Sequence, residues 1–87
     1  MTAEVRLPRV LTQAVKTGLR HEVSGENVDQ VLRGLFQLEP GLRNHLIDES
    51  GHIRTHVLVF VDGERADLTT AVPDGAAVQV LQAVSGG

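Results

Sequence analysis

Cysteine, tryptophan and tyrosine are absent from the sequence, and phenylalanine occurs only twice. The absence of cysteine excludes disulfide bonds, thiolate zinc sites and a cysteine nucleophile. Because large aromatic side chains are so few, any hydrophobic core must be built mainly from aliphatic residues.

Positive charge is scarce too, with 8 lysines and arginines against 11 aspartates and glutamates and a formal net charge of −3. Such a chain has no basic field that would hold the phosphates of a nucleic acid. Its longest uncharged apolar stretch, Val57 to Val61, is far too short to cross a bilayer, and the first residues lack the apolar segment of a signal peptide. We therefore expect a cytoplasmic protein with neither a nucleic-acid nor a membrane partner.

The remaining composition is that of a small folded domain. The chain has 87 residues, of which 41% are hydrophobic and 22% charged, and this balance suits a globule better than a disordered tail. We expect residues 1–87 to form a single domain with a small core.

The N-terminal third predicts two short strands. Residues 4–7 alternate polar and apolar side chains, and residues 10–11 continue this pattern beyond Pro8, where the strand ends or bulges. Residues 16–18 are turn-like, and residues 19–23 are expected to form a second strand that pairs back as a hairpin.

A helix is predicted to begin after Asn27, which suits an N-cap and has Gln30 three residues later. Pro40 and Gly41 end this helix, and residues 42–47 have the pattern of one further helical turn. The expected apolar face of the main helix consists of Val28, Val31, Leu32, Leu35 and Leu38.

The C-terminal half predicts three strands separated by turns. Residues 55–61 are β-branched and apolar on both faces, which indicates a buried strand in mid-sheet. A turn at Asp62-Gly63 leads into a weak strand at residues 64–68, and a turn at residues 73–75 leads into a closing strand at residues 77–84. The order β-β-α-β-β-β predicts an α+β fold with one helix across a mixed sheet.

No metal or carboxylate site is indicated by the spacing of the polar residues. Asp48, Glu49 and Asp62 have no nucleophile or apolar pocket implied around them, so we interpret them as solvated loop charges. The histidines lack a metal-ligand spacing and are expected at the surface: His21, His45, His52 and His56.

The sequence closes with Gly86-Gly87. Two glycines in a row form a thin tail that fits a narrow tunnel, and a terminal carboxylate activated as an acyl-adenylate accepts sulfur or an amine. The alternative is a frayed end or an expression scar. The residues that precede the pair favour the first interpretation.

These residues resemble the ubiquitin-like sulfur carriers of the ThiS/MoaD family. The family's "x-D-G-D-x-V" turn, apolar strand and terminal Gly-Gly match Asp74-Gly75, Val78 and residues 86–87. Ala76 replaces a frequent acidic residue, at a position that we expect to be solvated. Within the family the chain is most similar to the actinobacterial CysO-type carriers, through "V-x-L-P-x-V-L" at residues 5–11, the loop at residues 46–48 and "V-x-V-F-V-D" at residues 57–62.

The resemblance implies a β-grasp (ubiquitin-like) fold with about five strands, and a carrier that is not itself an enzyme. It implies that a MoeB/ThiF-like adenylating enzyme uses ATP to activate Gly87, that sulfur then converts the carboxylate to a thiocarboxylate, and that Ser85 and Gly86 occupy the enzyme's active site. It implies further that the carrier itself binds no cofactor and no metal. Further implied partners are a sulfur-acceptor synthase and a metalloprotease that regenerates the Gly-Gly end.

Leu81 leaves two interpretations open. If Val78 and Val80 face the core, alternation turns Leu81 and Ala83 to the other face of the strand. An exposed leucine there is either an ordinary surface residue or an anchor for the activating enzyme. The main alternative function is a protein modifier joined through Gly87 to lysines. The sequence argues against a third function, an interaction module whose tail has no chemistry, because such a module gains nothing from a terminal Gly-Gly.

Overall fold

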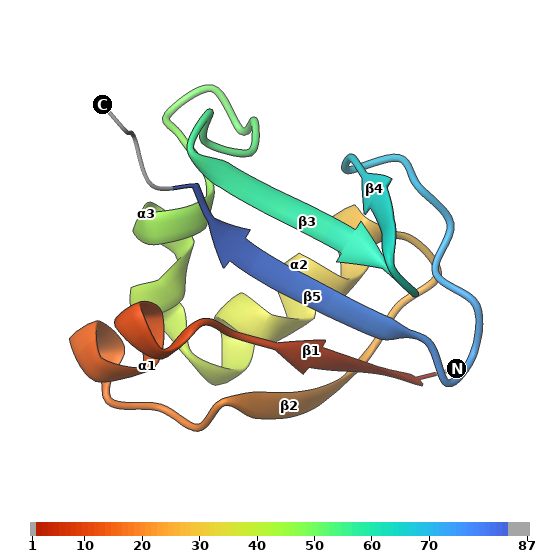
Figure 1. Ribbon diagram of the computed structural model, residues 1–87, viewed down its shortest axis with the longest axis horizontal. Coiled ribbons are helices and arrows are strands. Elements are labelled where there is room, and N and C mark those ends of the chain that lie inside the picture. The colour runs from red at the N-terminus through yellow and green to blue at the C-terminus, as the bar shows by residue number, and fades with distance from the viewer. Residues whose placement is uncertain (1, 84–87) are drawn as a thin grey trace.

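The computed structural model describes residues 2–83, which form a mixed five-stranded sheet with helices packed against it (Figure 1). The spatial order of the strands is β2-β1-β5-β3-β4. β1 and β5 pair in parallel, and every other pair is antiparallel. The strands are β1 (Thr2–Arg6), β2 (Arg20–Ser24), β3 (Val57–Val61), β4 (Glu64–Ala66) and β5 (Ala77–Gln82).

The main helix, α2 (Val28–Leu38), begins and packs as the sequence predicts. The Asn27 side chain accepts a hydrogen bond from the Gln30 amide at 2.8 Å, which satisfies one of the amides left open at a helix start. Leu38 was expected on the buried face but is 59% exposed, because it lies at the edge of that face in the last turn. Phe36, at the opposite edge, is buried in its place.

The prediction of a strand at residues 10–11 is wrong, because the chain forms helix α1 (Arg9–Val15) there. Pro8 ends β1, and its carbonyl accepts from the amides of Leu11 and Thr12 as the helix begins. Pairing of β1 with β2 is confirmed, but α1 rather than a tight turn connects them. The order of elements therefore begins β-α-β.

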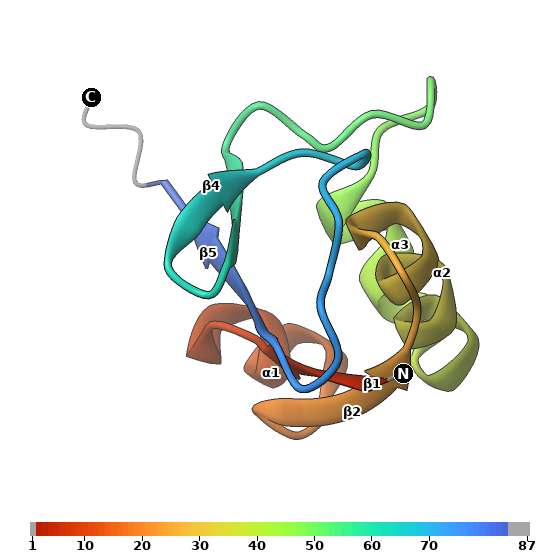
Figure 2. The same ribbon diagram turned by 90° about the vertical axis from the view of Figure 1, so that its right-hand side faces the viewer.

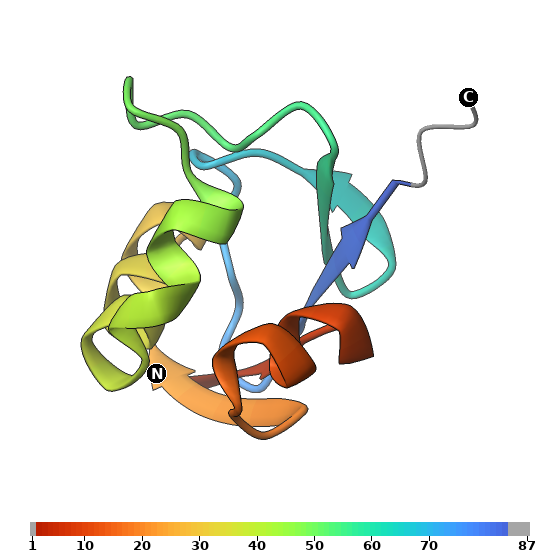
Figure 3. The same ribbon diagram turned by 90° about the vertical axis from the view of Figure 1, so that its left-hand side faces the viewer.

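Two short helices follow α2 and complete the helical side of the molecule. They are the 3-10 helix η1 (Pro40–Leu42) and α3 (Arg43–Leu46), which confirm the extra helical turn expected after Pro40. Figures 2 and 3 show α2 and α3 together on one side, with the strands curving round the other. None of the helices within residues 2–83 is long and apolar enough to cross a membrane.

The core between these layers is aliphatic, as the composition predicts. β3 was expected to be buried on both faces, but only alternate residues are buried, and Leu58 and Phe60 are half-exposed on the face away from the helices. The fully buried large side chains are Val5, Leu11, Val28, Val31, Leu32, Leu35, Leu42, Leu46, Val78 and Val80.

Candidate functional site

The predicted site lies at the end of β5, and the structure describes part of it. Leu81 and Ala83 are within the described residues, whereas Ser85, Gly86 and Gly87 lie outside them. We therefore describe where Leu81 and Ala83 lie and which hydrogen bonds hold β5.

β5 is held along its length by two neighbouring strands. Its pairing with β1 runs from Ala77 to Gln79, and its pairing with β3 runs from Val78 to Gln82. One residue further, the Ala83 amide donates to the His56 carbonyl at 2.7 Å. The chain is therefore fixed by the sheet up to Ala83, four residues before Gly87.

Two aspartates hold the beginning of β5, although the sequence indicated only turns at both positions. The Asp62 carboxylate accepts from the Ala77 amide at 2.9 Å, and the Asp62 amide donates to the Ala77 carbonyl at the same distance. Asp74 accepts from the Thr2 amide at 2.9 Å, and the Gly75 amide donates to the Thr2 carbonyl at 2.7 Å. Each turn thus clamps β5 to a neighbouring strand.

Ala76 corrects one expectation about the family motif. This position was expected to be solvated, but the residue is only 4% exposed. Gly75 has a φ of 81°, and the Ala76 amide closes the turn on the Pro73 carbonyl at 3.0 Å. A small apolar residue therefore fits where the chain turns inward to start β5, and an acidic side chain there would be costly to bury without a partner.

The outer face of the sheet, turned away from the helices, carries a small apolar patch. Val78 and Val80 are 0% and 1% exposed, so alternation places Leu81 on the outer face, where it is half-buried. Leu81 pairs directly with Leu58, and Phe60 lies two residues further along β3 on the same face. We call Leu58, Phe60 and Leu81 the outer patch; only Leu81 was identified from the sequence.

Polar side chains border the outer patch at Phe60. Phe60 stands opposite Gln79 on one side and Arg65 of β4 on the other. Gln79 is in turn paired with Arg6 of β1, whose side chain contacts Glu4 at 2.6 Å. The hydrogen bond from Arg6 is the main cause that lowers the pKa of the Glu4 carboxyl below its usual value. An apolar centre with a charged rim is typical of a protein-binding surface.

The histidines were expected at the surface, and three of them are exposed: His45, His52 and His56. His21 is half-buried, with its Nε2 at 3.1 Å from the Thr17 hydroxyl and 3.0 Å from the Gly18 carbonyl. Across the part of the chain that the structure describes, no three His, Asp or Glu side chains are grouped so that they could hold a metal ion.

The sequence matches the family model described as "ThiS family" over residues 5–87. A search of curated proteins found no match. The family match thus covers almost the whole chain, including the outer patch and β5.

Several solved structures are similar over nearly their whole length. CysO from Mycobacterium tuberculosis is 27% identical, with a TM-score of 0.84 over 94% of this chain and 99% of that one. CysO from Amycolatopsis orientalis, solved in a complex with BexX, is 24% identical, with a TM-score of 0.87 over 98% and 99%. SAMP1 from Haloferax volcanii is 24% identical, with a TM-score of 0.89 over the whole of both chains. The predicted ubiquitin-like β-grasp fold is confirmed.

Replacement of Asp62 by glycine tests whether this side chain holds β5. Glycine keeps the left-handed conformation that Asp62 adopts at a φ of 49°, but removes the acceptor of the Ala77 amide. We expect the free energy of unfolding to fall by about 1 kcal/mol, and hydrogen exchange at Ala77 to accelerate. The matched control is Asp62→Asn, which keeps both the acceptor and the backbone conformation. Unchanged exchange at Ala77 in Asp62→Gly would contradict this role.

Proposed function

The chain belongs to the ThiS family, and we propose that it is a sulfur carrier that holds sulfur as a thiocarboxylate on Gly87. The single observation that carries the proposal is the family match, which runs through β5 to the Gly86-Gly87 pair. Gly87 is the covalent site in this proposal, and Ser85 and Gly86 form the narrow segment that enters the partner's active site.

The proposed chemistry has two steps, both catalysed by a partner enzyme that binds ATP. The Gly87 carboxylate attacks the α-phosphorus of ATP, forming an acyl-adenylate and releasing pyrophosphate. A sulfide then attacks the carbonyl carbon, and AMP leaves with the electron pair of the broken C–O bond, which gives the thiocarboxylate directly. A persulfide donor would instead form an acyl disulfide, and a second thiol of the donor enzyme would attack its donor-side sulfur, releasing the thiocarboxylate and leaving a disulfide on the enzyme. Because the chain has no cysteine, the resulting –C(=O)S⁻ group would be the one sulfur nucleophile that the protein carries. The proposal makes the protein a substrate of enzymes rather than an enzyme.

The outer patch supports the proposal, because the partner must hold the folded body while the tail is in its active site. Leu81 lies on β5 six residues before Gly87 and faces outward beside Leu58 and Phe60. Ala83 is exposed at the end of the same strand, where a bulky side chain would obstruct docking. We propose that the adenylating enzyme binds this face of the sheet.

A second candidate function is conjugation to proteins, in which a lysine amine replaces sulfur as the nucleophile. The observation that favours it is the similarity to SAMP1, a small archaeal modifier protein. The two functions share the adenylation step and differ in the atom that displaces AMP. They are therefore distinguished by the product found in the native cells.

The acceptor of the sulfur is proposed only as a class. CysO of A. orientalis was solved in a complex with BexX, which supports the binding of a partner protein by this chain too. We propose that a synthase with an electrophilic substrate takes the sulfur from Gly87. If the acceptor remains attached as an adduct, a metalloprotease would be needed to restore the Gly-Gly end. The neighbouring genes would show which pathway is served.

The carrier function is tested by the intact mass of the protein purified from its native cells. We expect a fraction whose mass exceeds that of the unmodified chain by the difference between sulfur and oxygen, and whose C-terminal peptide localises the change to Gly87. Treatment with iodoacetamide should alkylate this fraction, since the only thiol-like group is the thiocarboxylate. Lysine-linked conjugates without any thiocarboxylate would favour the modifier function instead.

The need for a free Gly87 carboxylate is tested by adding one alanine after it. Residues 85–87 reach about 10 Å when extended, so an added residue would displace the carboxylate from the position where ATP is attacked. We expect ATP–pyrophosphate exchange with the adenylating enzyme to be lost and thermal unfolding to be unchanged. Exchange at the normal rate would overturn the proposed chemistry.

The role of the outer patch is tested with Leu81→Glu. Burial of a leucine side chain contributes about 1.5–3 kcal/mol, so affinity for the adenylating enzyme should fall by about tenfold or more. The free energy of unfolding should change by about 1 kcal/mol or less, because the substitution removes only the cross-strand contact between Leu81 and Leu58 on the outer face. Gln37→Glu, which makes the same charge change at an exposed position of α2, is the control. Equal affinity of the two variants would remove Leu81 from the interface.

A further inference from the structure

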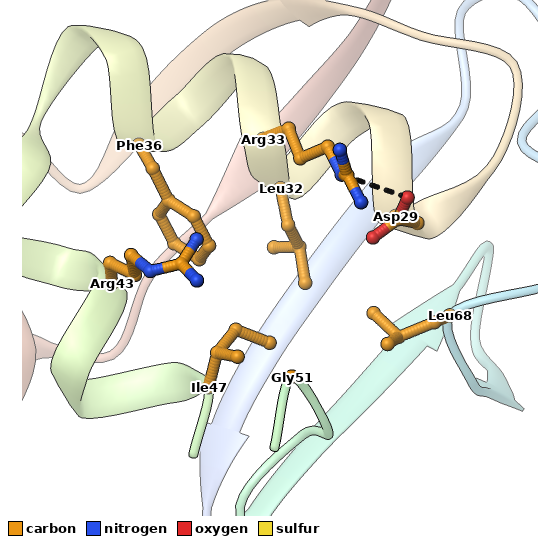
Figure 4. A pocket seen from close by; sticks show the side chains of 8 residues that line it. All are labelled: Asp29, Leu32, Arg33, Phe36, Arg43, Ile47, Gly51 and Leu68. Carbon is orange, nitrogen blue, oxygen red and sulfur yellow. Dashed lines mark ion pairs between the residues drawn. The ribbon is translucent and has the colours of Figure 1, made fainter. Parts of the chain in front are cut away.

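A cleft on the helical side of the molecule has no role in the function proposed above. It has a volume of about 190 Å³ and lies between α2, α3 and the segment that follows α3. Figure 4 shows its side chains converging from these elements, with Leu68 closing it from the chain between β4 and β5. None of its lining residues belongs to the outer patch.

The floor of this cleft is apolar and its size suits one side chain. Leu32, Phe36 and Ile47 are core residues whose surfaces reach the cleft, and Leu68 is half-buried beside them. By volume alone, an apolar cavity of about 150 Å³ holds one benzene-sized group, whereas sites for larger ligands begin at about 300 Å³. The cleft therefore fits a single aliphatic side chain better than a nucleotide or another cofactor.

The rim of the cleft is positive. Arg33 forms an ion pair with Asp29 at 3.0 Å, which neutralises the one acidic residue of the lining. Arg43, at the other end beside Phe36 (Figure 4), is exposed and takes part in neither of the two ion pairs found among residues 2–83. Its guanidinium offers a planar set of N–H donors suited to a carboxylate.

Asp48 forms no ion pair with Arg43 among the described residues, and its carboxylate is held within its own loop. It accepts from the amides of Ser50 at 2.9 Å and His52 at 3.0 Å. The hydrogen bond from His52 is the main cause that lowers the pKa of Asp48. These hydrogen bonds hold the loop at residues 48–52 together. Gly51 of this loop lines the cleft.

From this arrangement we infer that the cleft is a docking site for an acidic segment of a partner protein. An aliphatic side chain of the segment fills the floor over Leu32 and Ile47, and a neighbouring carboxylate pairs with Arg43. The site lies on the helical side, whereas the outer patch lies on the opposite face of the sheet, so both can be occupied at once. The inference uses no step at Gly87 and stands apart from the sulfur-carrier proposal.

The test is a titration of the ¹⁵N-labelled protein with a blocked peptide of sequence Asp-Glu-Leu-Asp-Glu, followed by NMR. We expect fast-exchange shifts at the amides of Arg33, Arg43 and Gly51 and none at Leu81. Replacement of the peptide's leucine by serine should remove the shifts. Arg43→Glu should weaken binding by about tenfold or more, whereas Arg9→Glu, an exposed charge reversal on α1, should leave it unchanged.

Three results would overturn the inference. The first is the absence of shifts around the cleft at millimolar peptide, and the second is equal affinity of Arg43→Glu and the wild type. The third is the same pattern of shifts with inorganic phosphate alone, which would show a simple anion site. If Arg43→Glu does not give a folded spectrum, Arg43→Gln removes the charge with less disturbance and must weaken binding in the same way.

Discussion

The arrangement of this domain depends on the pairing of β5 with β1 on one side and β3 on the other. Without β5 the remaining strands form two separate antiparallel pairs, β1 with β2 and β3 with β4. Neither pair would have the width to cover α2, and a two-stranded sheet is at best marginally stable in water. Val78 and Val80, both almost fully buried, join the two halves of the core.

The two faces of the sheet serve different needs because side chains alternate along each strand. The inner face is aliphatic and meets α2, whereas the outer face combines the outer patch with charged and amide side chains. Leu58 and Phe60 lie outside the buried core cluster, and the interface proposed above would give their apolar character a use. Because the strand that bears Leu81 also precedes Gly87 in the sequence, the proposed function would link recognition of the folded body and delivery of Gly87 through one strand.

Local sequence signals predicted the structure correctly where a single residue type determines the start of a helix or the position of a turn. Asn27 and the helical spacing after it predicted α2, and Asp62-Gly63 predicted the turn between β3 and β4. α1 was missed because it has only seven residues, and the apolar pattern of so short a segment fits both the helical and the strand periodicity. The partial exposure of Phe60 was missed for a different reason: in the sequence, an apolar residue on the outer face of a strand looks the same as one in the core. Of the predicted site, the register of Leu81 agrees with the burial pattern, while its role and those of residues 85–87 stay predictions.

The parallel pairing of β1 with β5 joins the two ends of the described chain, since Glu4 stands opposite Ala77. Contacts so distant in sequence form slowly and only after both partners have been synthesised. On the ribosome, the first strands must therefore wait with open edges until the last strand emerges. A copy truncated before β5 would remain unfolded and accessible to proteases. Cells that degrade such copies would retain only those in which a complete sheet supports the C-terminal segment.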